Sequence, residues 1–377
     1  LGNYRPITLL NVDYRIFALI YFRRLEIIRN QIMNTKLNSY QKGVNLTQNV
    51  QVIDLQIRKK LKNYILNTDY SKAFDSIHHE YIKEILMNHN FPNEFIEMIN
   101  KIYDNATSAV VGCNNKLTDD VDVQRGVRQG DSLSVFLFPL VLNPLLEKIN
   151  KLEKNQIVYA HADDVCYLFK TKKALKYTLK LIDRFTKISG LQLNKKKCKL
   201  ITSDNKLQHE YKSIPIVKEF KYLGFQLGKA GIINTYDDDI RYICDKMENM
   251  KHKYYLKTKI IILNTYLLAK LYYKLQLSPL SEEQLHEIQQ MIKWFLFYKS
   301  KIGFEKFDKG YPYRAKPSLQ RLYKSKAEGG YGLINLDLRS KTCAIKVIVN
   351  VLNGKMKLCN IFKNDFRILL AGHPSSL

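Results

Sequence analysis

Two adjacent aspartates, Asp163 and Asp164, stand between short apolar runs in the segment "VYAHADDVCYLFK" at residues 158–170, and His161 precedes them. Three interpretations are open: an acidic turn on the surface, a mixed His/Asp metal site, or half of an active site that transfers a nucleotide with two metal ions. That last chemistry uses carboxylates to hold two Mg²⁺ ions about 3.5–4 Å apart, one activating a hydroxyl and the other neutralising a triphosphate. Because Mg²⁺ binds through one or two protein carboxylates plus phosphate oxygens, one further aspartate from elsewhere in the chain is sufficient.

Asp69 is the candidate for that further carboxylate. The segment "YILNTDYSKAFDSIHHEYIKEIL" at residues 64–86 predicts a strand that ends near Asp69, then a tight turn and a helix with Asp75 or Ser76 as its N-cap. An aspartate at the end of one strand can then lie close to an aspartate pair in the turn of a neighbouring hairpin.

Other acidic runs in the chain serve as a comparison. A lone Asp-Asp pair is more often a solvated turn than a site, and "TDD" at 118–120 and "DDD" at 237–239 are predicted to be such turns. Residues 156–169 instead predict a β-hairpin with "ADD" as its turn. The apolar flanks on both sides of this "ADD" favour a central hairpin over a surface loop.

The rest of the first 230 residues alternates helices with short strands. Apolar spacing and turn residues predict a helix at 12–33, two short strands within 107–124, a helix from about Ser134, an amphipathic helix at 171–189 ended by Gly190, and a strand pair at 218–227. The order β, α, β-hairpin, α, β is that of a small antiparallel sheet with helices on one face, so we predict an α+β fold.

From about residue 240 the sequence becomes helical, and we predict a domain boundary near residue 230. The segment 254–277 is basic, rich in tyrosine and amphipathic, and Ser281 and Gln284 form a predicted capping box before an apolar run. The second part of the chain is therefore predicted to be all-α.

The net charge is strongly positive, with 61 Lys and Arg residues against 35 Asp and Glu residues, or +26. The excess is spread over the whole chain, which favours nucleic acid as the partner. An anionic membrane is the lesser option, and a lysine-rich proteome is the alternative that needs no specific partner. The apolar run at 133–146 is too short to span a bilayer and contains Pro139 and Pro144, so it is predicted to be a core helix.

Six scattered cysteines without a C-x-x-C pair or zinc-ligand spacing predict reduced thiols in an intracellular protein. No basic-then-apolar leader opens the sequence and no clear targeting signal is present, so secretion is not expected. The chain starts at Leu1 rather than at a methionine, which is expected of a piece of a longer reading frame.

Several short motifs in a fixed order resemble those of the reverse transcriptases of non-LTR (LINE-type) retrotransposons. The most specific are "KAFD" within 66–77, "RQGD" within 125–134 and "ADD" within 159–164, which are similar to motifs A, B and C of that family. The resemblance covers nearly the whole chain, with further matches at 3–16 and 39–50 for the fingers, 189–198 for motif D, 221–227 for the primer-grip motif E, and 326–338 for a Gly-Gly-hydrophobic segment past the thumb.

The resemblance implies a right-hand polymerase fold. Its parts are fingers (partial) at 1–63, a palm with a ferredoxin-like antiparallel sheet at 64–230, an all-α thumb at 231–302 and a post-thumb segment at 303–377. It also implies an RNA-directed DNA polymerase that adds dNTPs to a primer 3′ end, with two Mg²⁺ ions as cofactors and Mn²⁺ as a substitute. The implied partners are an RNA template, a DNA primer and dNTPs, with no membrane, and the implied location is nucleus and cytoplasm.

The resemblance implies catalytic roles for a few residues. Asp69, Asp163 and Asp164 are the implied metal-site carboxylates, with Asp164 beside the primer terminus, and the backbone carbonyl of Tyr70 completes the site. Lys197, at the N-x-x-K spacing of the family, is the implied general acid for the departing pyrophosphate. Phosphate binding by an ordinary lysine run is the open alternative for Lys197.

A second group of residues is implied to bind the incoming nucleotide. An arginine suits bidentate binding of a triphosphate better than a lysine does, an aromatic side chain can exclude a 2′-hydroxyl, and a glycine lets the backbone approach sugar and base. A solvated arginine and ordinary core packing of the aromatic ring are the alternatives. The implied residues are Arg5, Tyr70, Ala73, Phe74, Gln129 and Gly130.

His161, Tyr222, Leu223 and Gly224 are implied to contact the primer. The family prefers Phe or Tyr at the position of His161, and Pro at the position of Ser132, so the chain departs from its pattern at both. Neither departure removes a metal ligand, and a polymerase remains the prediction. The alternatives are a catalytically weak or inactive retroelement remnant and a maturase-like RNA-binding protein.

Overall fold

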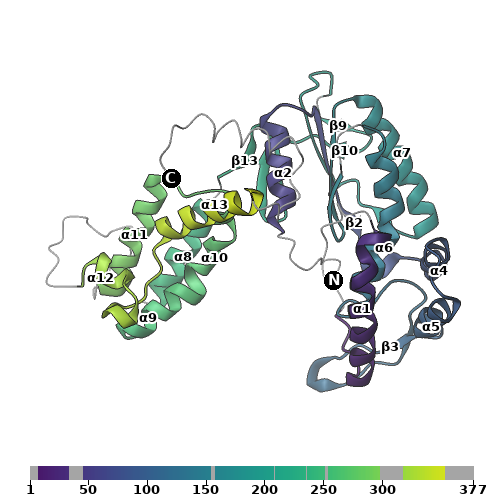
Figure 1. The fold of residues 1–377 in the computed structure, drawn as a ribbon, viewed down its shortest axis with the longest axis horizontal. Helices are drawn as coiled ribbons and strands as arrows, with labels where there is room; N and C mark the ends of the chain where they lie inside the picture. Colours follow the sequence, from purple (N-terminus) through teal and green to yellow (C-terminus); the bar gives the residue numbers. More distant parts are fainter. Residues whose placement is uncertain are drawn as a thin grey trace. The chain divides into compact units, whose positions relative to one another are not determined.

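The computed structural model describes residues 7–33, 46–153, 158–207, 209–234, 236–250, 254–297 and 317–352. The chain forms two compact units: unit 1 reaches to Leu223 and includes 227–231, and unit 2 contains Gly224–Gln226 and the residues from Ile232 onward. The changeover falls in the three-stranded sheet of β11 (Glu219–Tyr222), β12 (Phe225–Gly228) and β13 (Gly231–Ile233). Figure 1 shows the elements of both units.

The centre of unit 1 is a four-stranded antiparallel sheet. Its strands are β1 (Tyr64–Thr68), β5 (Val158–His161), β6 (Asp164–Phe169) and β8 (Lys199–Thr202), in the order β5-β6-β1-β8. β1 is a central strand that pairs with β6 on one side and β8 on the other. This order, with helices in the two crossovers, is that of a split β-α-β-β-α-β unit, so the antiparallel sheet predicted from the sequence is confirmed.

One face of this sheet is covered by α4 (His79–Asn88), α6 (Ser132–Asn150) and α7 (Lys172–Ser189), with α5 (Asn93–Tyr103) packed on α4. Because side chains alternate along a strand, Leu66, Val165 and Tyr167 point into this helical layer and join one apolar core. The run at 133–146 is part of the longer helix α6, which alone among the described residues is long and apolar enough to cross a membrane, so the prediction that its length excludes a span is wrong. However, 72% of its apolar window is buried, as a core helix requires.

The other face of the sheet is covered as well, which corrects the prediction of helices on one face only. Helix α2 (Thr47–Arg58) lies there, opposite α7 (Figure 1). Gln56 Nε2 donates to Tyr159 Oη at 2.5 Å, and Asn49 Nδ2 donates to Ala160 O at 3.1 Å. Polar side chains therefore attach α2 to the outer strand β5, a contact that hydrophobic periodicity does not predict.

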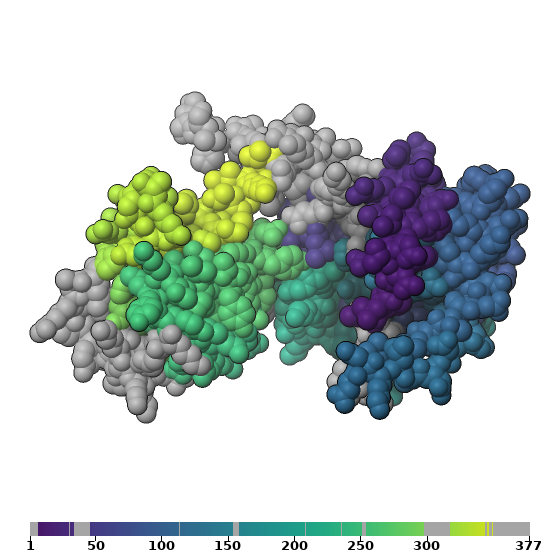
Figure 2. Space-filling view, turned by 90° about the horizontal axis from the view of Figure 1, so that it is seen from below, coloured from purple at the N-terminus to yellow at the C-terminus, as the bar shows by residue number. Residues whose placement is uncertain are grey.

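Helix α1 (Val12–Ile32) packs on α6 and lies on the surface of unit 1, as Figure 2 shows. Its inner side buries Ala18 and Leu25, whereas Ile16, Ile20 and Ile27 are exposed. The helix predicted at 12–33 is thus confirmed, with apolar residues on its outer side too.

The segment after β1 contains a correction. Strand β2 (Tyr70–Ser71) pairs with β7 (Gln192–Leu193), and the short helix α3 (Ala73–Ser76) follows. Asp75 and Ser76 lie inside α3, and α4 begins after His78 without a side-chain cap. Ser76 is not a cap because its Oγ donates to Lys72 O at 2.8 Å and Ser71 O at 3.1 Å.

The smaller elements of unit 1 are short hairpins and turns. Two predicted short strands are present as β3 (Thr107–Ser108) and β4 (Val121–Asp122), with the turn η1 (Cys113–Asn115) between them, and a second small pair is β9 (Glu210–Tyr211) with β10 (Ile214–Pro215). Gly190 ends α7 with φ +82°, as predicted.

Unit 2 is helical beyond β13, as predicted from the sequence. Its helices are α8 (Asp237–Met250), α9 (Leu256–Ile262), α10 (Ala269–Tyr272), α11 (Glu282–Phe297), α12 (Leu319–Tyr323) and α13 (Leu336–Leu352), with the π-helical segment η2 (Leu263–Leu267) and the 3₁₀ turns η3 (Lys274–Gln276) and η5 (Lys326–Glu328). Their buried core is separate from that of unit 1 and includes Trp294 and Phe295.

Two predictions concern the starts of helices in unit 2, and one of them is confirmed while the other is wrong. The capping box is confirmed: Gln284 N donates to Ser281 Oγ and Ser281 N donates to Gln284 Oε1, both at 3.2 Å. The "DDD" run at 237–239 is not a turn but the first turn of α8. Carboxylates are stabilised by the positive end of the helix dipole, and Asp239 also pairs with Lys274 at 2.6 Å.

Candidate active site

The end of β1 and the β5–β6 hairpin bring the backbones of the three predicted aspartates close together. In the β1–β6 register Thr68 lies opposite Val165, so the next residues, Asp69 and Asp164, face each other just beyond the ladder. His161 pairs with Asp164, which leaves Ala162 and Asp163 as the two turn residues of the hairpin. The turn is therefore one residue shorter than predicted, because Asp164 begins β6.

The hairpin turn has an unusual backbone. Ala162 has φ +51°, a region that non-glycine residues enter rarely and that the tightest hairpin turns require at their first position. Ala162 is also buried. The tight turn holds Asp163 at the tip of the hairpin.

Asp69 and Asp163 line the same pocket, whose volume is about 610 Å³. Two carboxylates with room for phosphate oxygens match the ligand preference of Mg²⁺, although no three His, Cys, Asp or Glu side chains among the described residues form a metal-binding group. Three cationic side chains line the same pocket and suit a polyphosphate. The full lining is Asp69, Tyr70, Ser71, Lys72, Ala73, Phe74, Ser76, Arg125, Gln129, Asp163, Gly190, Gln192, Asn194 and Lys197.

The backbone on both sides of Asp69 is held by the segment after β7. Asn194 N donates to Asp69 O at 2.8 Å, and Asp69 N donates to Cys198 Sγ at 3.4 Å. Burial raises the pKa of Cys198 to about 11 and that of Tyr70 to about 12, so both side chains stay neutral at pH 7. These contacts fix the end of β1 where the carboxylate enters the pocket.

Three consecutive lysines follow Asn194, and the structure separates them. Lys197 lines the pocket, Lys195 lies 3.9 Å from Asp183, and Lys196 is exposed. Lys197 N donates to Asn194 O at 3.0 Å, which turns the chain back toward the pocket. The N-x-x-K spacing therefore selects the lysine that lines the same pocket as the two carboxylates.

Most of the predicted nucleotide-binding residues lie around the pocket. Ala73, Phe74 and Gln129 line it, and the ring of Phe74 stacks on Phe138 with centroids 4.2 Å apart. Phe74 therefore lines the pocket and also packs in the core. Gly130 does not line the pocket; it has φ +104°, and a Cβ there would lie 3.3 Å from Thr8 O. The close approach at Gly130 is therefore to the backbone of Thr8.

The predicted primer-contact residues lie in or beside two hairpins, and one hydrogen bond joins strands β11 and β5 of these hairpins. Leu223 (φ +44°) and Gly224 (φ +83°) form the turn between β11 and β12, as two-residue turns with positive φ at both positions require. Tyr222 is buried, and its Oη donates to Tyr159 O at 3.0 Å, two residues before His161. Burial raises the pKa of Tyr222 well above its ordinary value.

Two cationic residues of this site were not predicted, and one prediction cannot be followed. Lys72 and Arg125 line the pocket with the carboxylates. Lys72 is the first residue of "KAFD" and Arg125 stands three residues before "RQGD", so their positions in and beside these motifs were the available signal. Arg5 lies outside the described residues.

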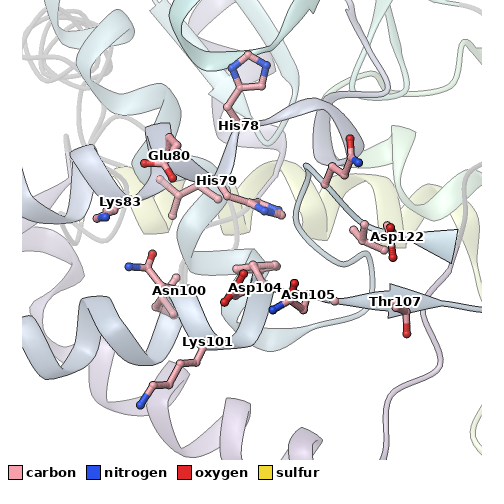
Figure 3. Close-up of a pocket in the computed structure, with 16 residues that line it drawn as sticks. His78, His79, Glu80, Lys83, Asn100, Lys101, Asp104, Asn105, Thr107 and Asp122 are labelled. Atoms are coloured by element: carbon pink, nitrogen blue, oxygen red, sulfur yellow. The ribbon is translucent and has the colours of Figure 1, made fainter. Parts of the chain in front are cut away.

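A larger pocket of about 910 Å³ lies elsewhere in unit 1, between α4, α5 and β4. Figure 3 shows side chains of α4 facing those of α5 and the following loop across it. It is lined by His78, His79, Glu80, Lys83, Asn100, Lys101, Tyr103, Asp104, Asn105, Thr107, Asp122 and Gln124 among others. No sequence motif predicted it.

Comparison with protein families identifies the class of protein. The model of the family "Reverse transcriptase (RNA-dependent DNA polymerase)" matches residues 1–227, more than half of the chain. The chain therefore belongs to the reverse transcriptase family, and the prediction made from motifs A, B and C is confirmed.

The curated relatives are retrotransposon polyproteins. The chain is 28% identical over 310 residues to the Retrovirus-related Pol polyprotein from type-2 retrotransposable element R2DM of Drosophila melanogaster, covering 71% of this chain and 28% of that protein. It is 26% identical over 325 residues to the Pol polyprotein from type-1 retrotransposable element R2 of Popillia japonica, covering 78% of this chain and 44% of that protein. The chain thus spans less than half the length of these relatives.

Among solved structures, telomerase from Candida tropicalis in complex with a fragment of telomeric RNA is similar with 16% sequence identity and a TM-score of 0.47, covering 75% of this chain and 47% of that one. A truncated apo telomerase of the same organism gives 17% identity and a TM-score of 0.46, with 59% and 47% covered. Both TM-scores are below 0.5, so the fold is argued from the sheet and its helices alone.

Proposed function

We propose that this chain is the polymerase part of a retrotransposon protein and adds dNTPs to a primer 3′ end, copying an RNA template. One observation carries the proposal: Asp69 and Asp163, from segments far apart in the sequence, line one pocket together with Lys197. Four of the predicted nucleotide-binding residues line it too: Tyr70, Ala73, Phe74 and Gln129. Membership of the reverse transcriptase family supports the same chemistry.

We propose that Asp69 and Asp163 hold two Mg²⁺ ions, with Asp164 and the backbone carbonyl of Tyr70 beside them. When bound, such ions lower the pKa of the attacking hydroxyl and neutralise the charge that develops on the phosphates. The residues present fit this cofactor because two carboxylates line one pocket, where phosphate oxygens could complete the metal coordination. Lys72, Arg125 and Lys197 line the same pocket and suit the phosphates.

The remaining roles follow from position. Lys197 is proposed to bind the outgoing phosphates and deliver a proton to pyrophosphate, because it lines the same pocket as the carboxylates. Phe74, Ala73 and Gln129 are proposed to contact the sugar and base of the dNTP. The turn Tyr222–Gly224 and His161 are proposed to lie along the primer strand.

The division of the chain supports a right-hand arrangement as a proposal. Residues 64–230, with the antiparallel sheet, are proposed to be the palm, and 1–63 part of the fingers. Residues 231–302, which are helical after β13 where described, are proposed to be the thumb, followed by a post-thumb segment at 303–377. The net charge of +26 is consistent with contacts to the backbones of template and primer.

Primer extension on poly(rA)/oligo(dT) with Mg²⁺ or Mn²⁺ tests the proposal. Asp163→Asn should lower the rate at least ~100-fold, since a metal site contributes several kcal/mol and about 1.36 kcal/mol corresponds to a factor of ten. Asp119→Asn is the matched control, because Asp119 belongs to the other Asp-Asp pair and is exposed away from the pocket.

Incorporation that survives Asp163→Asn at the wild-type rate would remove Asp163 from the site. A folded wild-type chain that binds RNA in a salt-sensitive way but incorporates nothing with either metal ion would favour a maturase-like binding protein. If Asp119→Asn and Asp163→Asn lose primer extension equally, the loss comes from a change in charge or folding and not from a change in the pocket.

A further inference from the structure

The loop Arg125–Asp131 carries Gln129 into the pocket, and it is held on every side by other segments of unit 1. Gly126 N donates to Ile77 O at 2.7 Å and Val127 N donates to Phe74 O at 2.6 Å, which join the loop to α3 and to the residue that follows it. On its far side, Thr8 N donates to Gln129 O at 2.9 Å. The residue that enters the pocket is therefore attached to the segment that leads into α1.

Arg128 is placed between two aromatic rings. Its guanidinium carbon lies 5.3 Å from the ring centroid of Tyr14 on α1 and 5.3 Å from that of Tyr103 on α5. Its Nη2 donates to Ile102 O at 2.8 Å. A cation between two ring faces is stabilised by both ring quadrupoles, so Arg128 ties the loop to α1 and α5 at once without entering the pocket.

Asp131 is a carboxylate with only 1% of its surface exposed. Its Oδ1 accepts from Leu133 N at 3.0 Å as the N-cap of α6, and its Oδ2 accepts from Tyr14 Oη at 2.8 Å. Serine or asparagine would cap the helix without burying a charge. A buried carboxylate is costly unless it is hydrogen-bonded and near a cation, and Tyr14 and Arg128 provide both conditions here.

Tyr14 is the common partner. It donates to Asp131 and lies under Arg128, so it touches the loop just before and just after Gln129 and Gly130. The Tyr14–Asp131 hydrogen bond joins residues 117 positions apart. Together with Thr8–Gln129 it attaches α1 to the loop at three points.

We propose that Tyr14, Arg128 and Asp131 are positioning residues that hold α1 and the Arg125–Asp131 loop as one body and thereby set the affinity for the incoming nucleotide. The inference rests on the proposed polymerase function for its kinetic consequence, although the coupling of α1 to the loop does not depend on it. None of the three side chains lines the pocket, so they act through Gln129 and not on the substrate.

Tyr14→Phe is the sharpest variant because it removes one hydroxyl and keeps the ring under Arg128. We expect the KM for dNTP to rise about tenfold, the effect of one lost hydrogen bond to a charged group, while kcat changes less than about twofold. Tyr21→Phe is the matched control: it removes a hydroxyl from the same helix, where Tyr21 packs on Phe17 and Phe95 away from the loop. A double-mutant cycle with Asp131→Asn, which retains a helix-capping side chain, should be non-additive.

A measurement that does not depend on catalysis can test this inference separately from the proposed function. In hydrogen exchange of the free protein, Tyr14→Phe should reduce protection of the Thr8 amide and of the Arg125–Asp131 loop together, and Tyr21→Phe should change neither. If the wild type does not polymerise but this exchange pattern holds, the proposed function fails and the coupling stands. Unchanged exchange at Thr8 in Tyr14→Phe, an equal effect of Tyr21→Phe, or additive effects of Tyr14→Phe and Asp131→Asn would each overturn the positioning role.

Discussion

The two pockets of unit 1 differ in how the chain builds them. The larger one, of about 910 Å³, is lined by a single stretch of chain between residues 78 and 124. The smaller one, of about 610 Å³, collects residues from 69–76, 125–129, 163 and 190–197. Bringing four distant segments to one point requires many long-range contacts, so the smaller pocket is the more specific product of the fold.

The backbone makes the same distinction. Lys72, which lines the smaller pocket, has φ +45°, and Ala162, next to Asp163, has φ +51°. Around the larger pocket the positive φ belongs to Asn105, a residue type that tolerates this region. Residues that do not favour a positive φ keep it only where the surrounding structure requires it, so the backbone at the smaller pocket is the more constrained of the two.

The largest expected effect comes from exchanging one carboxylate in each pocket. Asp69→Asn should reduce primer extension by at least ~100-fold, because a metal ligand is lost, whereas Asp104→Asn in the larger pocket should stay within about twofold of wild type. Circular dichroism melting of both variants checks that they fold. A large loss in Asp104→Asn with an intact fold would mean that the larger pocket takes part in the reaction.

Lys197 should give the next largest effect. As general acid, Lys197→Ala is expected to lower the single-turnover rate roughly 100-fold with a small change in the KM for dNTP. If Lys197 only binds phosphate, the KM should rise instead. Lys196→Ala is the control within the same lysine run, because Lys196 is exposed and does not line the pocket, and Lys83→Ala is the equivalent in the larger pocket.

The sequence predicted those parts of the structure that depend on near neighbours. The capping box of Ser281 and Gln284 follows from a spacing of three residues, and the end of α7 at Gly190 from one residue type. The same local reasoning failed at Ser76, because two carbonyls within its own turn accept its hydroxyl. It also failed at Asp239, whose lysine partner lies 35 residues further on.

More of the candidate site than of the surrounding fold could be predicted from the sequence. The motifs of the site resemble those of a known family, whereas a single helix or strand has no such resemblance. That resemblance selected Asp69, Asp163, Gln129 and Lys197, which the fold brings to one pocket. The supports of the site were not predicted. Bonds such as Tyr14–Asp131, across 117 positions, leave no periodicity in the sequence.

A smaller change is expected in the selectivity of the smaller pocket. Phe74→Val should lower the preference for dNTP over NTP by about 10–100-fold, the range that small changes of pocket volume produce. The variant also loses the stack on Phe138 and should melt at a lower temperature. Phe138→Leu removes the other ring of that stack from a fully buried position outside the pocket, so it should lower stability and leave selectivity unchanged. If both variants lose selectivity equally, the effect comes from packing and not from contact with the sugar.

The smallest effect should arise in the larger pocket and concern stability. His79 Nε2 lies 2.9 Å from Gly126 O, and its ring stacks on Tyr103 with centroids 4.8 Å apart. Burial lowers the pKa of His79 below its ordinary value of 6.5, so the unfolded chain takes up a proton at a higher pH than the folded protein does. The free energy of unfolding should therefore fall as the pH drops through about 6.5 and level off below the folded pKa, a change in Tm of about 2 °C or less.

His79→Gln keeps a donor for the Gly126 carbonyl and removes the titration, so its Tm measured between pH 7 and pH 5 should depend less on pH. If His79→Gln keeps the wild-type pH dependence of Tm, that dependence comes from other groups and not from His79.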